Sequence, residues 1–187
     1  MFSYCLQCQT QCCRIIAELL EKKGALRAFS PRIISRQRKQ GKLEDRAYDL
    51  LPGYVFVYTE QQLENFEVFS RVDGIIRRLS SETSSGCLTG GDFDFAMNLY
   101  RKNGIVGVVT IFKEGDSVRI DDPLFQSYNG TVLYIDHRKQ RAKLQFHFDE
   151  KDWIIWTACD VLYQNTDSAN ESGTKWEMRF LMKAQHE

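Results

Sequence analysis

The sequence predicts an α+β fold in two parts, in which an antiparallel sheet with flanking helices precedes a small β-barrel. Up to Asn103, strand-like alternation and helix-like periods follow one another, whereas after Gly104 only strand-like alternation continues. Short strand candidates separated by turn residues then follow closely, at residues 117–120, 130–136, 140–148, 152–157 and 160–163. So many short strands favour a sheet that closes on itself and leaves no open edge.

The composition is that of a globular chain without an overall attraction to polyanions. Of 187 residues, 43% are hydrophobic, so each part can bury a core. Lysine plus arginine number 25, as do aspartate plus glutamate, so any contact with nucleic acid must come from local patches. No apolar run reaches the roughly 18 residues of a membrane span, and the first ten residues lack a signal-peptide pattern. We expect a cytoplasmic monomer with no membrane partner.

The first elements are a strand over residues 2–7 and an amphipathic helix. Thr10 can cap this helix and Gly24 can end it. The spacing of apolar residues predicts a buried stripe that consists of Cys12, Ile15, Ile16, Leu19 and Leu20.

The middle of the sequence combines a basic segment with further sheet elements. Residues 32–46 hold six lysines and arginines around a turn at Gly41. Because the segment has no aromatic residue, we interpret it as a solvated loop that does not read base sequence. We predict strands over residues 54–58 and 74–79 and helices over residues 61–71 and 90–102. The last helix, capped by Thr89, should bury Phe93, Met97 and either Leu99 or Tyr100.

Several motifs in the right order resemble the NusG family of transcription factors. Residues 51–57, Leu-Pro-Gly-Tyr-Val-Phe-Val, are similar to the Phe-Pro-Gly-Tyr-Val/Leu-Phe-Val signature of the amino-terminal (NGN) domain of that family. Residues 72–76 resemble its Val-x-Gly-Val strand, and residues 88–92 its Leu-Ser-x-x-Glu helix start. Residues 113–120, Lys-Glu-Gly-Asp-Ser-Val-Arg-Ile, with Tyr-Asn-Gly-Thr-Val at residues 128–132, resemble a KOW motif.

The resemblance implies a domain organisation and a function. It implies an NGN-like domain over residues 1–103, a linker over 104–112, an SH3-like KOW barrel over 113–164 and a polar tail over 165–187. By this resemblance the chain is a non-catalytic elongation or antitermination factor that binds the clamp helices of the largest subunit of bacterial RNA polymerase. The residues implied in polymerase binding are Gln7, Leu51, Pro52, Tyr54, Phe56 and Leu88. The resemblance also places residues 32–46 where the family extends a flexible hairpin near upstream DNA, which is the alternative to a solvated loop.

Alternation along the strand predicted at residues 54–58 indicates which side chains share a face. Tyr54 and Phe56 share one face, and Val55 and Val57 share the other. If the valines face the core, the aromatic side chains remain partly exposed and can dock on a partner. The alternative is that all four side chains belong to the core.

A basic hairpin over residues 136–143 is the candidate nucleic-acid site. Its cations are Arg138, Lys139, Arg141 and Lys143, and Tyr134 and Phe146 offer stacking surface nearby. We therefore expect contact with nascent RNA, with a solvated turn as the alternative. The hairpin resembles the Ile-Asp-Arg-Arg-Lys-Arg-Arg-Ala stretch of LoaP, a group of specialised paralogues, which implies an operon-targeted antiterminator.

Three positions depart from the family pattern. Asp122 stands where the KOW motif commonly has glycine, and Ser3 stands where a tryptophan is expected. Residues 148–154, Phe-Asp-Glu-Lys-Asp-Trp-Ile, replace a Phe-Gly-Arg-x-Thr-Pro-Val segment that usually helps to contact protein partners. Binding to the ribosome or to a termination factor therefore stays open.

The cysteines and histidines predict no catalytic or metal site. Cys5, Cys8, Cys12 and Cys13 crowd together, but a strand, a turn and a helix would point them in different directions. The histidines lack the spacing of a catalytic triad, so we expect no enzyme, no metal and no cofactor. Two alternatives are carried beside the leading hypothesis: a KOW-type RNA- or ribosome-binding protein without polymerase binding, and a thiol or zinc enzyme.

Overall fold

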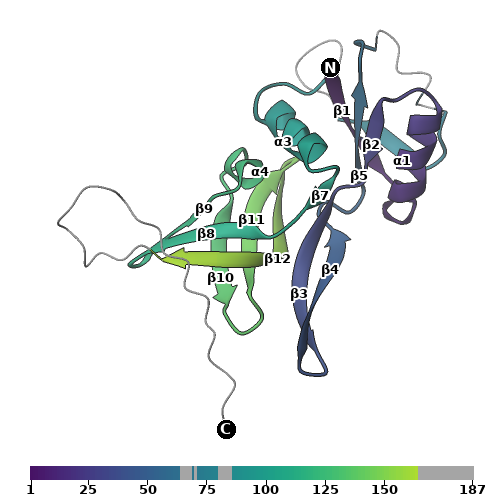
Figure 1. The fold of residues 1–187 in the computed structure, drawn as a ribbon. Helices are drawn as coiled ribbons and strands as arrows, with labels where there is room; N and C mark the ends of the chain where they lie inside the picture. Colours follow the sequence, from purple (N-terminus) through teal and green to yellow (C-terminus); the bar gives the residue numbers. More distant parts are fainter. Residues whose placement is uncertain (64–68, 70, 80–85, 164–187) are drawn as a thin grey trace.

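The first domain is built on a four-stranded antiparallel sheet with the order β2-β5-β1-β6 (Figure 1). The structure, a computed structural model, describes residues 1–63, 69, 71–79 and 86–163. The strands are β1 (Phe2–Cys8), β2 (Arg27–Phe29), β5 (Tyr54–Thr59) and β6 (Ile75–Arg78). After a short 3-10 turn, η1 (Thr10–Cys12), helix α1 (Cys13–Lys22) covers one face of the sheet, and α3 (Gly90–Arg101) packs on the other. The helix expected over residues 61–71 lies mostly outside the described residues.

Both helices bury only part of the predicted stripe: Ile16, Leu20 and Leu99 are buried as predicted. The buried residues of α1 are Cys13, Ile16, Ala17 and Leu20, whereas Ile15 and Leu19 are exposed. The buried stripe is centred near Leu20, so Ile15 and Leu19 point about 100° or more away from it. In α3 the buried residues are Phe95, Ala96 and Leu99, while Phe93 and Met97 are only partly buried.

The basic segment is a long β-hairpin, so its interpretation as a loop was wrong. Strand β3 (Arg32–Lys39) pairs with β4 (Lys42–Asp49), and β7 (Ile105–Val106) adds in parallel to β3. Gln40 and Gly41 have positive φ angles of 48° and 82°, as a tight hairpin turn requires. Cross-strand hydrogen bonds, with an ion pair between Arg36 and Asp45, hold together a segment that has too few apolar residues to look like a strand.

The second domain is a curled five-stranded sheet with the order β10-β11-β12-β8-β9. Its elements are β8 (Val109–Glu114), β9 (Ser117–Ile120), α4 (Pro123–Gln126), β10 (Thr131–Asp136), β11 (Arg141–Phe148) and β12 (Lys151–Tyr163). The edge strands β9 and β10 contact each other, so the sheet closes into a small barrel. The single strand β12 replaces two predicted strands, because its first part pairs with β11 and its last part with β8. Strand β8 begins within the segment expected to be a linker.

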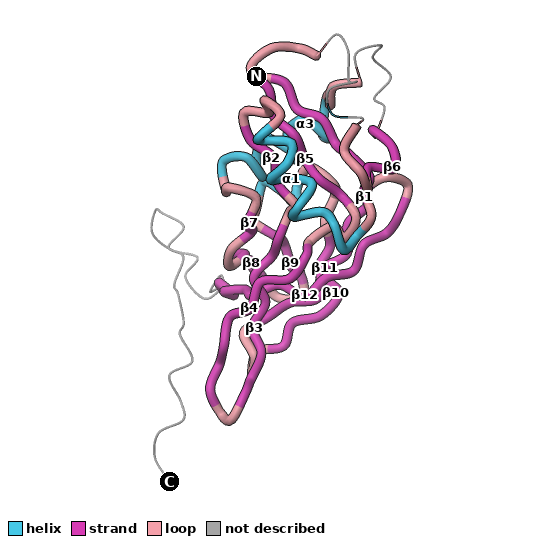
Figure 2. Tube along the Cα trace, turned by 90° about the vertical axis from the view of Figure 1, so that its right-hand side faces the viewer, coloured by secondary structure: helices cyan, strands magenta, loops and turns pink. Residues whose placement is uncertain are grey.

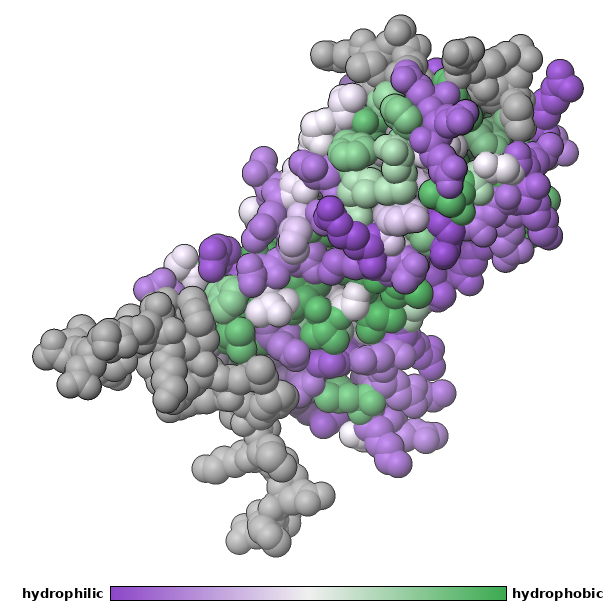
Figure 3. Space-filling view, turned by 45° about the horizontal axis from the view of Figure 1, so that its top comes forward, coloured by the Kyte–Doolittle hydropathy of each residue, from purple (hydrophilic) through white to green (hydrophobic). Residues whose placement is uncertain are grey.

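The two domains pack against each other through a shared hydrophobic core. One buried cluster contains Tyr54, Phe56 and Phe95 from the first domain together with Phe146 and Phe148 from the barrel. The barrel lies under α3 and beside the β3–β4 hairpin in two perpendicular views (Figures 1 and 2). Hydrophobic side chains form a band across the face seen in Figure 3, with hydrophilic side chains on both sides. No helix in the described part of the chain is long and apolar enough to cross a membrane.

Candidate functional site

A tight turn before Tyr54 sets the direction in which β5 runs beside β1. The backbone N–H of Leu50 donates to Pro31 O at 2.8 Å, and that of Cys8 donates to Gly53 O at 2.7 Å. Gly53 has a φ of 92°, a conformation that side chains with a Cβ rarely adopt. The turn thereby places Tyr54 opposite Gln7 in the antiparallel register.

The two faces of β5 are both buried, by different parts of the molecule. Val55 and Val57 pack in the cluster under α1, as the alternation predicts. Tyr54 and Phe56 point to the other face, where their exposed fractions are only 2% and 0%. The expectation that these two aromatic side chains are partly exposed was therefore wrong, because the barrel covers them.

The cover consists of aromatic rings from the barrel. Phe148 at the end of β11 lies 5.2 Å from Tyr54 and 6.0 Å from Phe56, measured between ring centroids. Trp153 of β12 lies 5.9 Å from Tyr54 with the ring planes at 81°. Both contacts of Tyr54 are edge-to-face, an arrangement that aromatic pairs prefer, whereas Phe148 is tilted at 43° to Phe56. Aromatic rings of the barrel thus bury this face of β5.

A polar cluster closes the edge of this aromatic contact. The Tyr54 hydroxyl donates to Asp149 Oδ2 at 2.6 Å, and Arg77 Nη2 lies 3.0 Å from the same oxygen. Arg77 Nε also donates to Gln7 Oε1 at 2.7 Å. Burial, followed by the hydrogen bond to Asp149, raises the pKa of Tyr54 well above its usual range, so the phenol stays protonated.

Three further contacts join the domains. The Tyr128 hydroxyl donates to Asp92 at the start of α3, and burial raises the pKa of Tyr128. Lys102, just after α3, forms an ion pair of 2.9 Å with the buried Asp122 of the barrel. The Thr157 hydroxyl lies 3.4 Å from Ile34 O in β3. These contacts fix the barrel against two elements of the first domain.

The turn that presents Asp149 is strained. Asp149 and Glu150 join β11 to β12 with φ angles of 49° and 58°, a hairpin turn that usually takes Asn-Gly or Asp-Gly. Each such residue without glycine costs about 1–3 kcal/mol, and the surrounding contacts must offset this cost. The bonds of Asp149 to Tyr54 and Arg77 are contacts of this kind.

The remaining residues expected to bind polymerase are divided between the core and the surface. Leu51 and Leu88 are buried, Pro52 is exposed, and Gln7 is half-buried and bonded to Arg77. The structure therefore brings Gln7, Tyr54 and Phe56 together under the barrel and leaves Pro52 at the surface. Sequence reasoning missed the residues that cover them, which are Phe95, Tyr128, Phe148, Asp149 and Trp153. For Phe148, Asp149 and Trp153 the only signal was the departure of residues 148–154 from the family pattern. Nothing in the sequence indicated that Phe95 and Tyr128 take part.

The basic hairpin has fewer available cations than the sequence indicates. Arg138 and Lys139 lie in the turn, but Arg141 is stacked 4.1 Å over the Trp156 ring and lies 3.3 Å from Asp136. The Arg141 side chain is only 17% exposed. Lys143 of β11 is paired with Tyr134 of β10 and with Trp156 of β12, so these three residues form one row across the sheet.

Only one of the two predicted aromatic residues, Tyr134, is accessible near this hairpin. Tyr134 is 57% exposed and makes an edge contact with Trp156. Phe146 is buried against Phe125, so the prediction that it offers stacking surface was wrong. It alternates with Arg141 and Lys143 along β11 and therefore faces the barrel interior. Trp156, which sequence reasoning missed, takes that place on the outer face.

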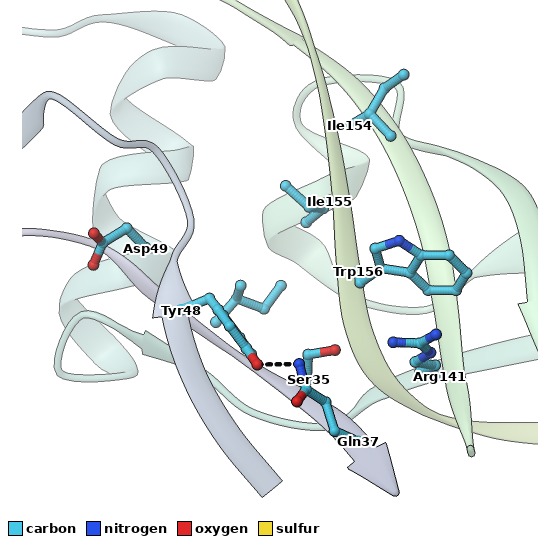
Figure 4. A pocket seen from close by; sticks show the side chains of 9 residues that line it. Ser35, Gln37, Tyr48, Asp49, Arg141, Ile154, Ile155 and Trp156 are labelled. Atoms are coloured by element: carbon cyan, nitrogen blue, oxygen red, sulfur yellow. Dashed lines mark hydrogen bonds between the residues drawn. The ribbon is translucent and has the colours of Figure 1, made fainter. Parts of the chain in front are cut away.

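The β3–β4 hairpin and strand β12 enclose a cavity of about 250 Å³ (Figure 4). The cavity lies between the two domains, and its lining is formed by Ile33, Ser35, Gln37, Tyr48, Asp49, Arg141, Ile154, Ile155 and Trp156. In Figure 4, Tyr48 and Gln37 come from the hairpin, whereas Trp156 and Arg141 come from the barrel. The cavity exists only because the domains pack together.

Burial raises the thiol pKa of two cysteines in the first strand. Burial, followed by the nearby Asp149 carboxylate, raises the pKa of Cys5. Burial, followed by Cys13 and Cys12, raises the pKa of Cys8 to about 12. All six cysteines are free thiols, and the described residues contain no group of three or more His, Cys, Asp or Glu that could hold a metal ion.

Comparison with known proteins identifies the first domain. Residues 3–89 match the family model described as "NusG: Transcription termination factor nusG". Residues 3–89 therefore form a domain of the NusG type. Two curated relatives carry the name "Transcription termination/antitermination protein NusG". The one from Buchnera aphidicola is 23% identical over 106 residues, 56% of this chain and 59% of the relative. The one from Vibrio cholerae is 28% identical over 116 residues, 60% of this chain and 62% of the relative.

The chain thus aligns with about three fifths of the length of these curated relatives. A solved structure described as "Domain interaction in Thermotoga maritima NusG" matches with a TM-score of 0.50 at 20% identity, over 83% of this chain and 92% of that chain. At this identity the match concerns the fold alone. It confirms the predicted α+β fold with a small SH3-like barrel after the NusG domain. The resemblance of the hairpin to LoaP stays a prediction.

Proposed function

We propose that this chain, with its NusG-type domain, is a non-catalytic transcription elongation or antitermination factor. In this proposal the face of β5 with Tyr54 and Phe56 docks on the clamp helices of the largest subunit of bacterial RNA polymerase. One observation carries the proposal: Phe148 and Trp153 of the second domain cover these two aromatic side chains at the family's signature motif, with Phe95 of their own domain packed beside Phe56.

Docking and closure exclude each other in this arrangement. Phe148 and Trp153 occupy the surface that a polymerase helix would contact. Aromatic side chains that lose their cover become the anchors that dominate a helix-docking surface. The factor therefore binds polymerase only in an open state, and polymerase shifts the population towards that state by binding it alone.

The contacts between the domains are suited to reversible opening. Contacts between domains within one chain resemble transient protein–protein interfaces. The Arg77 side chain in the polar cluster is 51% exposed, so solvent weakens its ion pair with Asp149.

The barrel has a second proposed role, which is contact with RNA. Arg138 and Lys139 lie at the tip of the β10–β11 hairpin, and the partly exposed row of Tyr134, Lys143 and Trp156 lies beside it. Cations together with accessible aromatic rings are the usual surface for single-stranded RNA. This row stays accessible when the domains are closed, which favours the second candidate function, an RNA-binding protein without polymerase binding.

Equilibrium binding to bacterial RNA polymerase tests the docking proposal. The Trp153→Ala variant removes part of the cover and should bind several-fold more tightly than wild type. The Tyr54→Ala/Phe56→Ala variant removes the anchors and should bind more weakly, provided that circular dichroism shows it to be folded. Asp152→Ala, an exposed change in the same hairpin, is the control.

The two candidate functions give different outcomes. If neither variant changes the affinity for polymerase, or if wild type and Trp153→Ala both fail to bind it while the chain binds RNA, the docking proposal is rejected. Transcription in vitro through a terminator, with and without a native leader, then distinguishes general from element-dependent action.

A further inference from the structure

The domain packing brings two basic hairpins side by side. The turns of the β3–β4 and β10–β11 hairpins lie towards the same end of the molecule (Figures 1 and 2). Arg36 of β3 donates from Nη1 to Gln140 Oε1 in the β10–β11 turn at 2.9 Å, and the same atom lies 3.7 Å from Asp160. Arg36 is therefore a fixed bridge between the hairpins rather than a free cation.

The tips of both hairpins carry cations without an ion pair to any other described residue. These are Arg38, Lys39 and Lys42 from the first domain and Arg138 and Lys139 from the barrel. The acidic residues of the two hairpins pair elsewhere: Glu44 with Arg46, Asp45 with Arg36, and Asp136 with Arg141. The tips thus combine into one positive surface that belongs to neither domain alone.

The cavity between the hairpins adds aromatic and hydrogen-bonding groups to this surface. Its volume of about 250 Å³ is below the usual range for a drug-sized ligand and suits a smaller planar group. Tyr48 and Trp156 are its aromatic residues, and the Gln37 amide donates to the Tyr48 hydroxyl (Figure 4). Ser35 adds a hydroxyl to the lining. Asp49 is paired with Arg14, which leaves Arg141 as the cation of the lining.

We propose that the cavity and the two hairpin tips form one binding site for a single-stranded nucleic acid, in which an unstacked base enters the cavity against Tyr48 and Trp156. The phosphates on either side of that base contact the cations at the two tips. Unstacked bases bind aromatic rings and guanidinium planes, and phosphates bind clustered lysine and arginine. The inference rests on the proposed RNA contact of the barrel and extends it, because half of the site belongs to the NusG domain.

The site has a consequence for the proposed docking on polymerase. Only the closed arrangement joins Tyr48 to Trp156, so the nucleic acid binds the closed state more tightly than the open one. Coupling between two ligands is reciprocal, so the nucleic acid must weaken polymerase docking by the same factor by which polymerase weakens nucleic-acid binding. The chain would then release one ligand as it takes the other.

Fluorescence measurements on the full chain test the site. The probes are 12-nucleotide single strands of one mixed sequence, made as RNA and as DNA, with a central 2-aminopurine. Binding should quench the 2-aminopurine through stacking. Tyr48→Ala should weaken binding by about five- to a hundredfold, the range expected for losing one aromatic stack. A preference for the RNA or the DNA probe identifies the source of the strand.

The matched control lies on the same strand. Leu43 of β4 is 39% exposed, as is Tyr48, but it does not line the cavity, so Leu43→Ala should bind like wild type. The opening variant Asp149→Asn should also weaken binding, because it separates the two halves of the site.

The outcomes separate this inference from the proposal on which it rests. If wild type binds RNA but Tyr48→Ala and Asp149→Asn bind it equally well, the barrel binds RNA alone and the composite site is rejected. If wild type binds neither probe, the proposed RNA contact fails together with the site.

Discussion

The phenol of Tyr54 and the carboxylate of Asp149 are 95 residues apart in sequence and 2.6 Å apart in the structure. Tyr54 lies in the motif that matches the NusG family, whereas Asp149 lies in the segment that departs from it. The departure therefore has a structural meaning, since the segment binds the first domain of its own chain. Asp122, another departure from the family pattern, also contacts the first domain, through its ion pair with Lys102.

Asp149→Asn should favour opening of the domains. Asparagine tolerates the positive φ of this turn, so the change removes charge without breaking the hairpin. Charge-assisted bonds are worth about 1.5–3 kcal/mol, and with Arg77 half-exposed we expect closure to weaken by about 1–2 kcal/mol. Alkylation of Cys5, followed by mass spectrometry, measures the effect because Cys5 lies in the same buried cluster as Tyr54. Its rate should rise about five- to thirtyfold.

Asp152→Asn is the matched control for this change. Asp152 is in the same hairpin and pairs with His147, but its side chain is 62% exposed and does not contact the first domain. Its variant should leave the rate at Cys5 unchanged. Equal rates for Asp149→Asn and wild type would show that the carboxylate does not hold the domains together.

Glu150→Gly should stabilise the barrel. Glu150 has a φ of 58°, and glycine adopts this conformation without strain and completes the favoured Asp-Gly turn. We expect about 1 kcal/mol of added stability, measured as a higher midpoint of urea unfolding. Asp149→Gly relieves the same strain but loses the bonds to Tyr54 and Arg77. A gain in stability from both changes would mean that the Asp149 contacts contribute little.

The sequence predicted the fold where local signals and packing agree. Strand alternation at Tyr54 and turn chemistry at Gly53 gave the correct placement of β5 and of the two faces of the strand. The helix stripes were shifted because Ile15 and Phe93 are apolar yet not selected for burial by the sheet. Periodicity counts apolar residues, whereas burial depends on which of them the partner surface reaches.

The cover on the candidate site could not be predicted from the pattern of residues. Nothing local to Tyr54 specifies a partner such as Phe148, since contacts between distant segments follow from the tertiary arrangement. The sequence also does not indicate which cations are paired. Arg141 was counted as an available cation, but it is stacked on Trp156 and bonded to Asp136. The motif order located the surface, and only the structure located what covers it.

High pH should open the domains. Tyr54 and Tyr128 have raised pKa values in the closed state, so closure retains its full stability below the ordinary tyrosine pKa of about 10. Above that pH the open state loses protons and the closed state keeps them, so closure weakens by about 1.4 kcal/mol per pH unit for each residue. Small-angle X-ray scattering between pH 8 and 11 should show the radius of gyration rising. In Tyr54→Phe the radius of gyration should rise less steeply with pH. If it rises as in wild type, ionisation of Tyr54 does not contribute to opening.

The hairpin cations should contribute unequally to RNA binding. Arg138→Ala with Lys139→Ala should reduce the slope of log affinity against log salt by up to about 2, because both lie at the tip and can reach phosphates. Arg141→Ala should change the slope less, because that guanidinium is occupied by Trp156 and Asp136. Fluorescence anisotropy across a salt series measures both. If Arg141→Ala changes the salt slope more than the Arg138→Ala/Lys139→Ala variant does, the phosphates contact strand β11 and not the hairpin tip.

Gly104→Ala should destabilise the junction between the domains. Gly104 has a φ of 73°, and a Cβ there would lie 2.7 Å from the Phe29 ring, which is packed between Tyr58 and Tyr100. Its carbonyl also accepts from Arg32 N, so the backbone cannot move away freely. Strain and overpacking together should cost about 2–4 kcal/mol. Urea unfolding measures this cost, with Gly107→Ala as the control.

Gly107 is three residues further along the chain, has no positive φ, and has no atom within 4 Å of a built Cβ. Its change to alanine should therefore alter stability by at most about 0.5 kcal/mol. The Gly104 variant should also alkylate faster at Cys5, because Phe29 and Cys5 belong to one buried cluster. Equal stabilities for the two variants would mean that the segment between the domains relaxes freely. The close approach of Gly104 to Phe29 would then play no part in setting the position of the barrel.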